Sequence, residues 1–582
     1  MVMNSRSCLL DFPEDLAGWK RSLPYALLLS ITAALYSASL YFSFQWDDHL
    51  YVEGNPLIRS ISPAGLRAIW SAPFLGHYAP LHITLLALLY KFWGLSPLGF
   101  HVAQLLLHGV CVCLLYFLLK KLETPGIALL ATLLFVVHPT NIETVAWIAE
   151  TKSTLAFLFF LLAFLAFIRL EFRKRPYDAM LVAILLALSL FSKINTVVAP
   201  AIFLAYSYRQ RSLSEPLIRK TLAYCFALSA IFIAIHLSSF FASSTTLARS
   251  GLEGSYYGGF AIHLLNLPFL LFFYVQMLVY PHPLTAWHMF LVRQGITWAV
   301  AGAWIILAGF VWLVFRANRN VQFWSFWFVA FLAPVLQFIP NLTWVAERYL
   351  YIPAIGMFVL FARLIFFLRK SSPKLWQRWC WDAGVVAALG VLFGLTAGHV
   401  PVFRNDLTLW GAALPTCSTS AQCHAGFGES LLGEGQTARG MRELIQAVDI
   451  RPSAVYLTKL GDGFTFSAKD YNQAVIAYRM ALKQTPSDGV LQLKLARALI
   501  QAGRLNEGFE SLRSAAQRIP GDPAVLVVKS FLEWKQGNWE AARATIQKSL
   551  VITSQASLTP QFLLYFWGNE AEAGQFMRDL FL

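Results

Sequence analysis

The sequence predicts an all-α protein, in which a polytopic membrane helical bundle precedes a C-terminal solenoid of helical repeats. The chain has 582 residues, of which 57% are hydrophobic and 13% charged, and its mean hydropathy is +0.56. Soluble domains carry about 25% charged residues. Long apolar runs continue to residue 402, and a 34-residue repetition follows them.

The apolar runs predict the membrane helices, because a bilayer-spanning helix needs about 20 mostly apolar residues. We expect about eleven spans, the shorter ones tilted or broken: 23–44, 100–119, 126–138, 153–170, 178–192, 195–208, 219–240, 296–315, 321–340, 349–369 and 382–401. The first has no small-residue cleavage site, so we interpret it as an uncleaved anchor. Two further stretches, 79–93 and 262–283, are interpreted as re-entrant or interfacial.

The basic loops predict the orientation. With these spans, every loop rich in Lys and Arg falls on one side, which is the cytoplasmic side in membrane proteins. The net charge of +15 therefore reflects topology and does not indicate nucleic-acid binding. We predict an integral protein of a bacterial inner membrane, with a cytoplasmic N-terminus and a periplasmic tail after residue 402.

The tail carries an internal repeat. Four sets of residues recur every 34 positions: Pro452, Pro486 and Pro520; Gly435, Lys469, Gly503 and Gly537; Ala447, Ala481, Ala515 and Ser549; Gly440, Ala474, Gly508 and Ala542. This period, with small residues at helix crossings, is typical of tetratricopeptide repeats. We expect a membrane domain at 1–402, a linker at 403–420 and repeats at 421–582. Such arrays bind peptides on a concave face; the alternative is a stabilising platform.

The predicted external loops hold acidic residues, which are scarce elsewhere in the membrane half, together with three cations. The acids there include Asp47, Asp48, Glu143, Glu150 and Glu347, and the cations are Lys152, Lys193 and Arg348. Ionisable groups at membrane depth are costly and usually functional. An isolated Asp pair at the end of a span is equally often a helix cap.

These residue types suit a transfer reaction on a lipid phosphate. One carboxylate can act as general base for an attacking hydroxyl, and the other can orient the acceptor or bind a metal through oxygen. Arg348 offers a bidentate fork and Lys193 a point charge for a phosphate. The loops therefore predict group transfer from a lipid phosphate to a hydroxyl.

The sequence predicts no organic cofactor and no zinc site. No Cys/His spacing suits zinc, and no glycine motif for nucleotides is present; a divalent metal on carboxylates stays open. Cys417 and Cys423 lie six residues apart in the external region. They form either a disulfide, which that compartment favours, or two free thiols.

Four stretches of the chain, together with the repeats, resemble a known family. The stretches "FQWDDHLYVEGNPLI", "LLFVVHPTNIETVAWIAETKSTLAFLFFLLA", "YPHPLTAW" and "VAERYLYIPAIG", followed by the repeats, are similar to the transmembrane-and-TPR O-mannosyltransferases and their bacterial relatives, of the GT-C superfamily. The resemblance implies a GT-C-like bundle and a polyprenyl- or dolichyl-phosphate sugar donor. It also implies inversion at the sugar and an acceptor hydroxyl, such as a protein Ser or Thr held by the repeats.

Carried onto this sequence, the resemblance implies roles for individual residues. Asp47 is the base and Asp48 supports the acceptor, with the order open. Arg348, Lys193 and Tyr349 bind the donor phosphate. Supporting roles fall to His138, Glu143, Lys152 and Glu347, but His138 could instead cap a broken helix, and Glu143 could simply pair with Lys152. Ile194 and Asn195 depart from the family, which usually has an acid after this lysine.

Three other classes of protein remain as alternatives. A glycan ligase or polymerase of the cell envelope would place its working residues in a long loop between late spans. A non-enzymatic membrane scaffold displaying the repeats would not need acids and cations on one face. A transporter would show matching interrupted helices in two halves.

Overall fold

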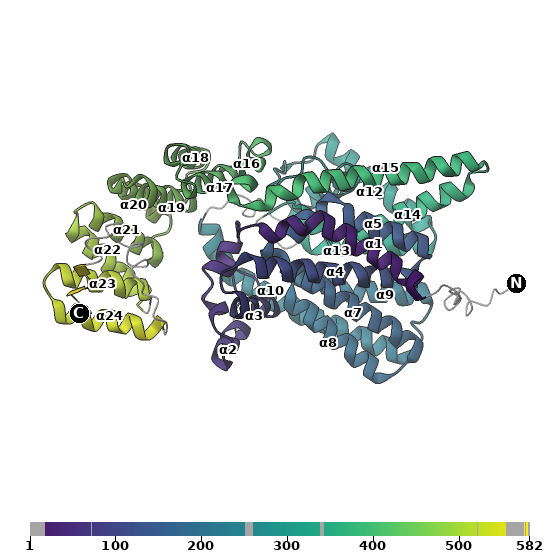
Figure 1. The fold of residues 1–582 in the computed structure, drawn as a ribbon, viewed down its shortest axis with the longest axis horizontal. Helices are drawn as coiled ribbons and strands as arrows, with labels where there is room; N and C mark the ends of the chain where they lie inside the picture. Colours follow the sequence, from purple (N-terminus) through teal and green to yellow (C-terminus); the bar gives the residue numbers. More distant parts are fainter. Residues whose placement is uncertain are drawn as a thin grey trace. The chain divides into compact units, whose positions relative to one another are not determined.

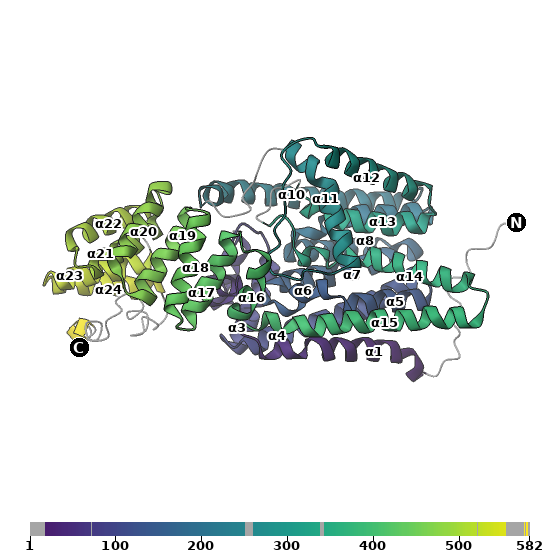
Figure 2. The ribbon, with the colours of Figure 1, turned by 90° about the horizontal axis from the view of Figure 1, so that it is seen from above.

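The computed structural model describes residues 18–71, 73–250, 260–337, 343–520, 522–553, 575–576 and 578–579. Over these residues the secondary structure is helical, apart from one isolated bridge between Phe74 and His77. The chain divides into two compact units (Figures 1 and 2): Met1–Ser244 with Tyr256–Thr416, and Thr245–Ser255 with Cys417–Leu582. The predicted all-α fold class is confirmed.

Unit 1 contains the apolar helices. They are α1 Gly18–Tyr36, α2 Pro63–Ser71, α3 Pro80–Trp93, α4 Pro97–Leu122, α5 Pro125–Val137, α6 Ile142–Ala146, α7 Thr151–Arg173, α8 Pro176–Ser192, α9 Ala199–Gln210, α10 Pro216–Ser250, α11 Phe260–Val279, α12 Trp298–Arg316, α13 Arg319–Leu332, α14 Ala354–Ser371, α15 Leu375–His399 and α16 Asp406–Ala413.

The expected count of about eleven spans is not reached. Within the described chain, seven helical segments are long and apolar enough to cross a membrane, or eight if the bent pair Pro125–Val137 and Pro139–Ala146 is one span. The predicted spans 195–208 and 321–340 overlap α9 and α13, which have 12 and 14 residues. These helices are shorter than the roughly 20 residues that a bilayer requires.

Helix α7 lies at the centre of unit 1. It is apolar on all sides over most of its length and is largely buried, as expected for a helix surrounded by others. The ring of Phe160 lies 5.0 Å from that of Phe331 and 5.5 Å from that of Trp327, both of α13. Because helices in lipid associate mainly by close packing, these aromatic contacts help to hold the bundle together.

The break between α5 and α6 positions part of the site. The two segments meet at an angle of 60° where Pro139 follows His138. Proline favours a break because it lacks an N–H and restricts the residue before it. The chain then continues through α6 and the turn Ile148–Glu150 into α7, so two glutamates lie near the end of the bundle.

Helix α11 bears on the topology. By length and composition this 20-residue helix could cross a membrane. However, His263 near its start stacks on Trp344 at 5.2 Å, and the carbonyl of Leu278 near its end lies 3.2 Å from His138 Nε2. Both contacts are with segments at the same end of the bundle. The interfacial position expected for 262–283 stays a prediction, because the helix is also one of the seven segments that could cross.

Unit 2 is built of helix pairs (Figure 1). They are α17 Ala421–Gly433 with α18 Thr437–Ile450, α19 Ala454–Asp462 with α20 Tyr471–Gln484, α21 Gly489–Gln501 with α22 Leu505–Arg518, and α23 Pro523–Lys535 with α24 Trp539–Thr553. The pairs begin at Ala421, Ala454, Gly489 and Pro523, so they follow one another at about the predicted 34-residue period.

The repeated residues have structural causes. Gly435, Gly503 and Gly537 have φ of 74° to 78° and Lys469 has φ of 55°, in the left-handed region that glycine enters at little cost. At Gly440 an added Cβ would come within 2.7 Å of Leu432 Cδ2. Small residues are therefore needed where paired helices cross. Unit 2 also contains the Cys417–Cys423 disulfide, so the bridge is the alternative that the structure supports.

Candidate active site

The loop after the first span enters the site through an unusual backbone turn. α1 ends at Tyr36, a short 3-10 segment follows over Ser37–Tyr41, and Trp46 has a left-handed φ of 48°. Its N–H donates to Asp406 Oδ1 at 2.7 Å, which helps to hold this uncommon conformation. The side chains of the two acids that follow, Asp47 and Asp48, therefore lie in different environments.

The two aspartates are not equivalent. Asp48 is fully buried, and its Oδ1 accepts from the N–H of Ala149 at 2.7 Å while Oδ2 accepts from that of Gln45 at 3.2 Å. Asp47 is partly exposed, and among the described residues none donates a hydrogen bond to its carboxylate. Asp48 thus fastens the loop to the segment before α7, whereas Asp47 keeps both oxygens available.

The electrostatic setting of Asp47 suits a base. Burial raises the pKa of its carboxyl above the ordinary value, while Lys152 and Arg348 act in the opposite direction. The pKa of Asp48 is raised further, by complete burial, although its two backbone donors oppose the shift. A carboxylate of increased basicity beside fixed cations is a suitable acceptor for a hydroxyl proton.

The cations form ion pairs with two glutamates. The Arg348 guanidinium pairs with Glu143, whose second oxygen accepts from the Arg348 N–H at 2.7 Å. Lys193 Nζ lies 2.8 Å and Lys152 Nζ 3.6 Å from the carboxylate of Glu150. The alternative that Glu143 pairs with Lys152 is therefore wrong, because each glutamate has a nearer cation.

This network brings together distant parts of the chain. Its members come from α6, the turn before α7, the first turn of α7, the residue after α8 and the segment Glu347–Leu350. Arg348 Nε also lies 3.9 Å from Glu150 Oε1, so the two ion pairs are continuous. Burial lowers the pKa of Lys193 to about 8, against the effect of Glu150. The network is therefore a compact set of nearly balanced, desolvated charges.

Three tryptophans form one wall of the site. Trp46 stacks on Trp147 at 4.7 Å and meets Trp410 edge-on at 5.0 Å. The Arg348 guanidinium lies 5.7 Å from the Trp46 ring and 5.4 Å from the Trp147 ring. Cation–π contacts of this kind hold a guanidinium in one orientation.

Asp406 is the main residue that sequence reasoning missed. Besides holding the N–H of Trp46, its Oδ2 lies 2.6 Å from His49 Nε2, and the other ring nitrogen of His49 contacts Glu53. The hydrogen bond to Asp406 raises the pKa of His49 to about 9, with Glu53 acting in the same direction. Asp406 lies about 360 positions from the first loop, so the sequence offers no local signal for this contact.

Other predicted residues have structural partners. His138 bonds Thr140 at 2.8 Å and the Leu278 carbonyl, so it caps the broken helix and fastens α11. Glu347 accepts from the N–H of Thr285 at 2.9 Å and from His288 at 3.1 Å. The buried Tyr349 ring lies 5.2 Å from the Arg348 guanidinium.

The arrangement places a carboxylate without a hydrogen-bond donor among the described residues close to a cluster of cations. Within the residues that the structure describes, no group of three or more His, Cys, Asp or Glu side chains could hold a metal ion. The chemistry that this chain's own residues offer is proton acceptance by Asp47 and stabilisation of negative charge by Arg348, Lys193 and Lys152.

Comparison with known proteins agrees with the resemblance noted in the sequence. No family model matches the chain. It is 24% identical over 455 residues to "Protein O-mannosyl-transferase F38B6.6" of Caenorhabditis elegans, covering 73% of this chain and 62% of the relative. It is 26% identical over 495 residues to "Protein O-mannosyl-transferase TMTC4" of Homo sapiens, covering 71% and 64%. Over 157 residues it is 34% identical to "Protein O-mannosyl-transferase TMTC1" of Mus musculus, covering 25% and 16%.

Among solved structures, a chain of "APC/C hetero-tetramer Cut9-Hcn1" aligns with a TM-score of 0.27 at 14% identity, covering 73% of this chain and 81% of that one. MamA aligns with a TM-score of 0.23 at 15% identity, covering 25% and 86%. The chain spans less than two thirds of the length of each O-mannosyl-transferase given above. Its similarity to proteins named protein O-mannosyl-transferases is confirmed.

Proposed function

We propose that the protein is a membrane glycosyltransferase that moves a sugar from a polyprenyl-phosphate donor to a hydroxyl of a protein acceptor. The observation that carries the proposal is the unbonded carboxylate of Asp47, on the same loop as Asp48 and close to a continuous network of Arg348, Lys193 and Lys152. The names of the relatives support the reaction class.

The donor phosphate would be held by the cations. Arg348 presents a planar fork that matches two phosphate oxygens, and Lys193 adds a point charge. In this structure both cations are held by carboxylates, Glu143 and Glu150. These partners keep the cations desolvated, oriented and charged before the donor enters, which is the preorganisation that favours stabilisation of a leaving group.

The transfer would be a single displacement. Asp47 accepts the proton of the acceptor hydroxyl as its oxygen attacks the anomeric carbon of the sugar. The bond from that carbon to the phosphate oxygen breaks, and the lipid phosphate leaves with the electron pair near Arg348 and Lys193. Attack opposite the leaving group inverts the anomeric centre. Asp48 positions the base because it fixes the loop through two backbone bonds.

The repeats suit capture of the acceptor. Stacked tetratricopeptide pairs present an extended concave surface that binds peptide segments. We therefore propose that unit 2 binds the acceptor protein, while the lipid donor remains in the bilayer beside unit 1. A Ser or Thr hydroxyl in an extended segment is the acceptor group that this division of roles favours.

The compartment is part of the proposal. With the basic loops inside, the site and the repeats lie in the periplasm of a bacterial inner membrane, and the N-terminus lies in the cytoplasm. A reporter that is active only in the cytoplasm, fused after Leu582, is expected to be silent. A strong cytoplasmic signal would overturn this orientation.

The decisive experiment is a transfer assay. Purified full-length protein is mixed with polyprenyl-phosphate sugars carrying a labelled sugar and with acceptor peptides containing Ser or Thr. Label is expected in the peptide, with the anomeric configuration opposite to that of the donor. Transfer to a polysaccharide acceptor alone would favour the glycan ligase or polymerase. The absence of transfer from every donor, with peptide binding retained, would favour the scaffold.

A further inference from the structure

Unit 1 contains a pocket at the end of the bundle opposite the candidate site. It encloses about 780 Å³ and is lined by the start of α5, the turn between α12 and α13, the end of α14 and the start of α15. α14 begins at Ala354, just after the segment that carries Arg348, and ends at Ser371 beside the pocket. Its 18 residues correspond to about 27 Å, so the pocket and the site are on opposite sides of the membrane region.

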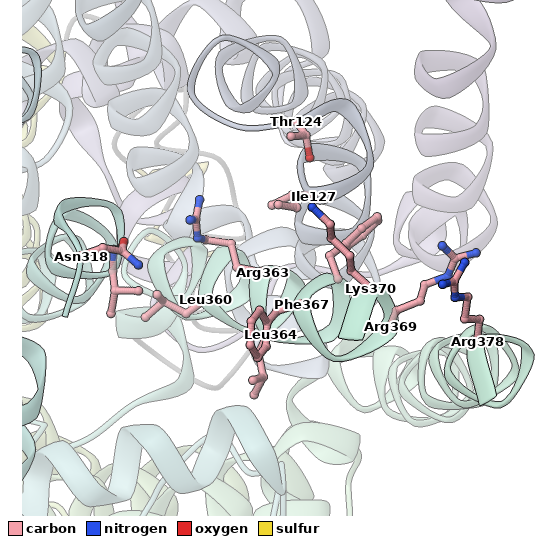
Figure 3. Close-up of a pocket in the computed structure, with 12 residues that line it drawn as sticks. Thr124, Ile127, Asn318, Leu360, Arg363, Leu364, Phe367, Arg369, Lys370 and Arg378 are labelled. Atoms are coloured by element: carbon pink, nitrogen blue, oxygen red, sulfur yellow. The ribbon is translucent and has the colours of Figure 1, made fainter. Parts of the chain in front are cut away.

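The lining combines positive charge with apolar surface. Its charged members are Arg363, Arg369, Lys370 and Arg378, and none of its twelve residues is acidic. Figure 3 shows the side chains of Arg363 and Lys370 leaving α14 on the side of Thr124 and Ile127. A ligand here would meet cationic nitrogens next to aliphatic and aromatic groups.

Two of the cations already have acidic partners outside the lining. Arg363 pairs with Glu123. Arg369 donates to both carboxylate oxygens of Asp382, at 2.6 and 3.0 Å. Among the residues that the structure describes, none forms an ion pair with Lys370, and Arg378 donates from Nε to the Ser372 carbonyl at 3.0 Å. Lys370 and the outer nitrogens of Arg378 therefore retain charge that a ligand can neutralise.

The apolar part of the pocket reaches the exposed surface of unit 1. Leu364 and Phe367 line the pocket and are 53% and 66% exposed, which is expected for side chains that face acyl chains. Basic pockets between membrane helices on the cytoplasmic side are suited to anionic lipid head groups. A free phosphate would use the cations but would leave this apolar surface uncovered.

We propose that this pocket binds an anionic phospholipid, with the phosphate at Lys370 and Arg378 and an acyl chain against Leu364 and Phe367. The site is separate from the donor site, because it lies at the other ends of α5 and α14. It would fasten the cytoplasmic end of these helices, which carry the Glu143 and Arg348 segments at their opposite ends.

The test uses the full chain in detergent with phosphatidylglycerol, phosphatidylcholine of the same acyl chains, or inorganic phosphate. Binding is followed by native mass spectrometry and by the shift in melting temperature. The variant is Lys370→Gln with Arg378→Gln; the control is Arg219→Gln with Lys220→Gln, which removes equal charge from exposed residues of α10 outside the lining. Arg363 and Arg369 stay unchanged because they hold Glu123 and Asp382.

Phosphatidylglycerol is expected to bind in preference to phosphatidylcholine. The pocket variant should bind it about 25-fold more weakly, since each of the two cations near an anionic lipid contributes about fivefold, while the control binds normally. Both should melt as wild type does without lipid. Equal binding by pocket variant and control, or equal binding of phosphatidylcholine, would overturn the proposal. Displacement of the lipid by millimolar inorganic phosphate alone would assign the cations to a soluble phosphate and overturn the lipid assignment.

Discussion

Replacing Asp47 by Asn tests the central assignment. The two side chains are nearly the same size, and no described residue donates to the Asp47 carboxylate, so the fold should tolerate the change. A general base contributes about 10²–10⁴-fold to rate, equivalent to about 2.7–5.4 kcal/mol of transition-state stabilisation. Turnover should fall by this factor, with the melting temperature and the donor KM nearly unchanged.

Asp48→Asn is the matched control. Asp48 accepts two backbone N–H groups through its two oxygens, whereas an amide has one oxygen and would place an NH₂ group against the second donor. The loss of a hydrogen bond to a charged acceptor costs about 1.5–3 kcal/mol. This variant should therefore melt at a lower temperature and lose less turnover per folded molecule than Asp47→Asn does.

The assay is single-turnover transfer from a polyprenyl-phosphate sugar to a Ser/Thr peptide, with matched amounts of folded protein. Its pH profile adds a second readout. Because the pKa of Asp47 is raised and the base must be ionised, kcat/KM should rise with pH through a value above the ordinary aspartate range. Asp47→Glu should move this limb, and Asp47→Asn should abolish it. Wild-type turnover in the Asp47→Asn variant would refute the reasoning.

Two further predictions concern the surroundings of the base, and a third concerns a helix crossing in unit 2. Glu143→Gln leaves a buried guanidinium without its main partner; the protein should melt earlier, and a lipid phosphate should raise its melting temperature more than in wild type. For His49, the folded pKa of about 9 lies above the ordinary value, so its stabilisation is complete below pH 6.5 and is lost as pH rises through about 9. Asp406→Asn should flatten that decline in thermal melts. Gly440→Ala overpacks a helix crossing and should destabilise unit 2 by about 1–3 kcal/mol, measured by hydrogen exchange.

Controls separate these effects from general damage. For Gly440→Ala, the matched control is Gly433→Ala. Gly433 is in the same helix pair, and an added Cβ there meets nothing within 4 Å. For Glu143→Gln, the control is Glu53→Gln. If a lipid phosphate raised the melting temperature of this control more than that of Glu143→Gln, the role given to the pair of Arg348 and Glu143 would be contradicted. For the histidine, a melting temperature independent of pH between 7 and 10 in wild type would contradict the His49 prediction.

Much of the fold follows from the sequence. A bilayer leaves few ways to satisfy the backbone, so apolar runs such as 100–119 predict helices directly. The 34-residue repeat is predicted equally directly, because Gly435 and Gly503 recur at positions where the chain must adopt a left-handed turn. The number of spans is not predicted as well, because short helices such as α9 are accommodated by neighbours that the sequence does not identify.

The sequence by itself determined which residue types gather in the loops that were predicted to be external, including Asp47, Arg348 and Lys193. Only the tertiary structure decided how they pair. Asp48 is bonded to backbone from before α7, and Asp406 fixes Trp46 from about 360 positions away. The physical reason is that a buried charge must pair with a group that lies close to it in space. The number of residues between two positions does not give their distance in space when helices of the bundle lie between them in the chain.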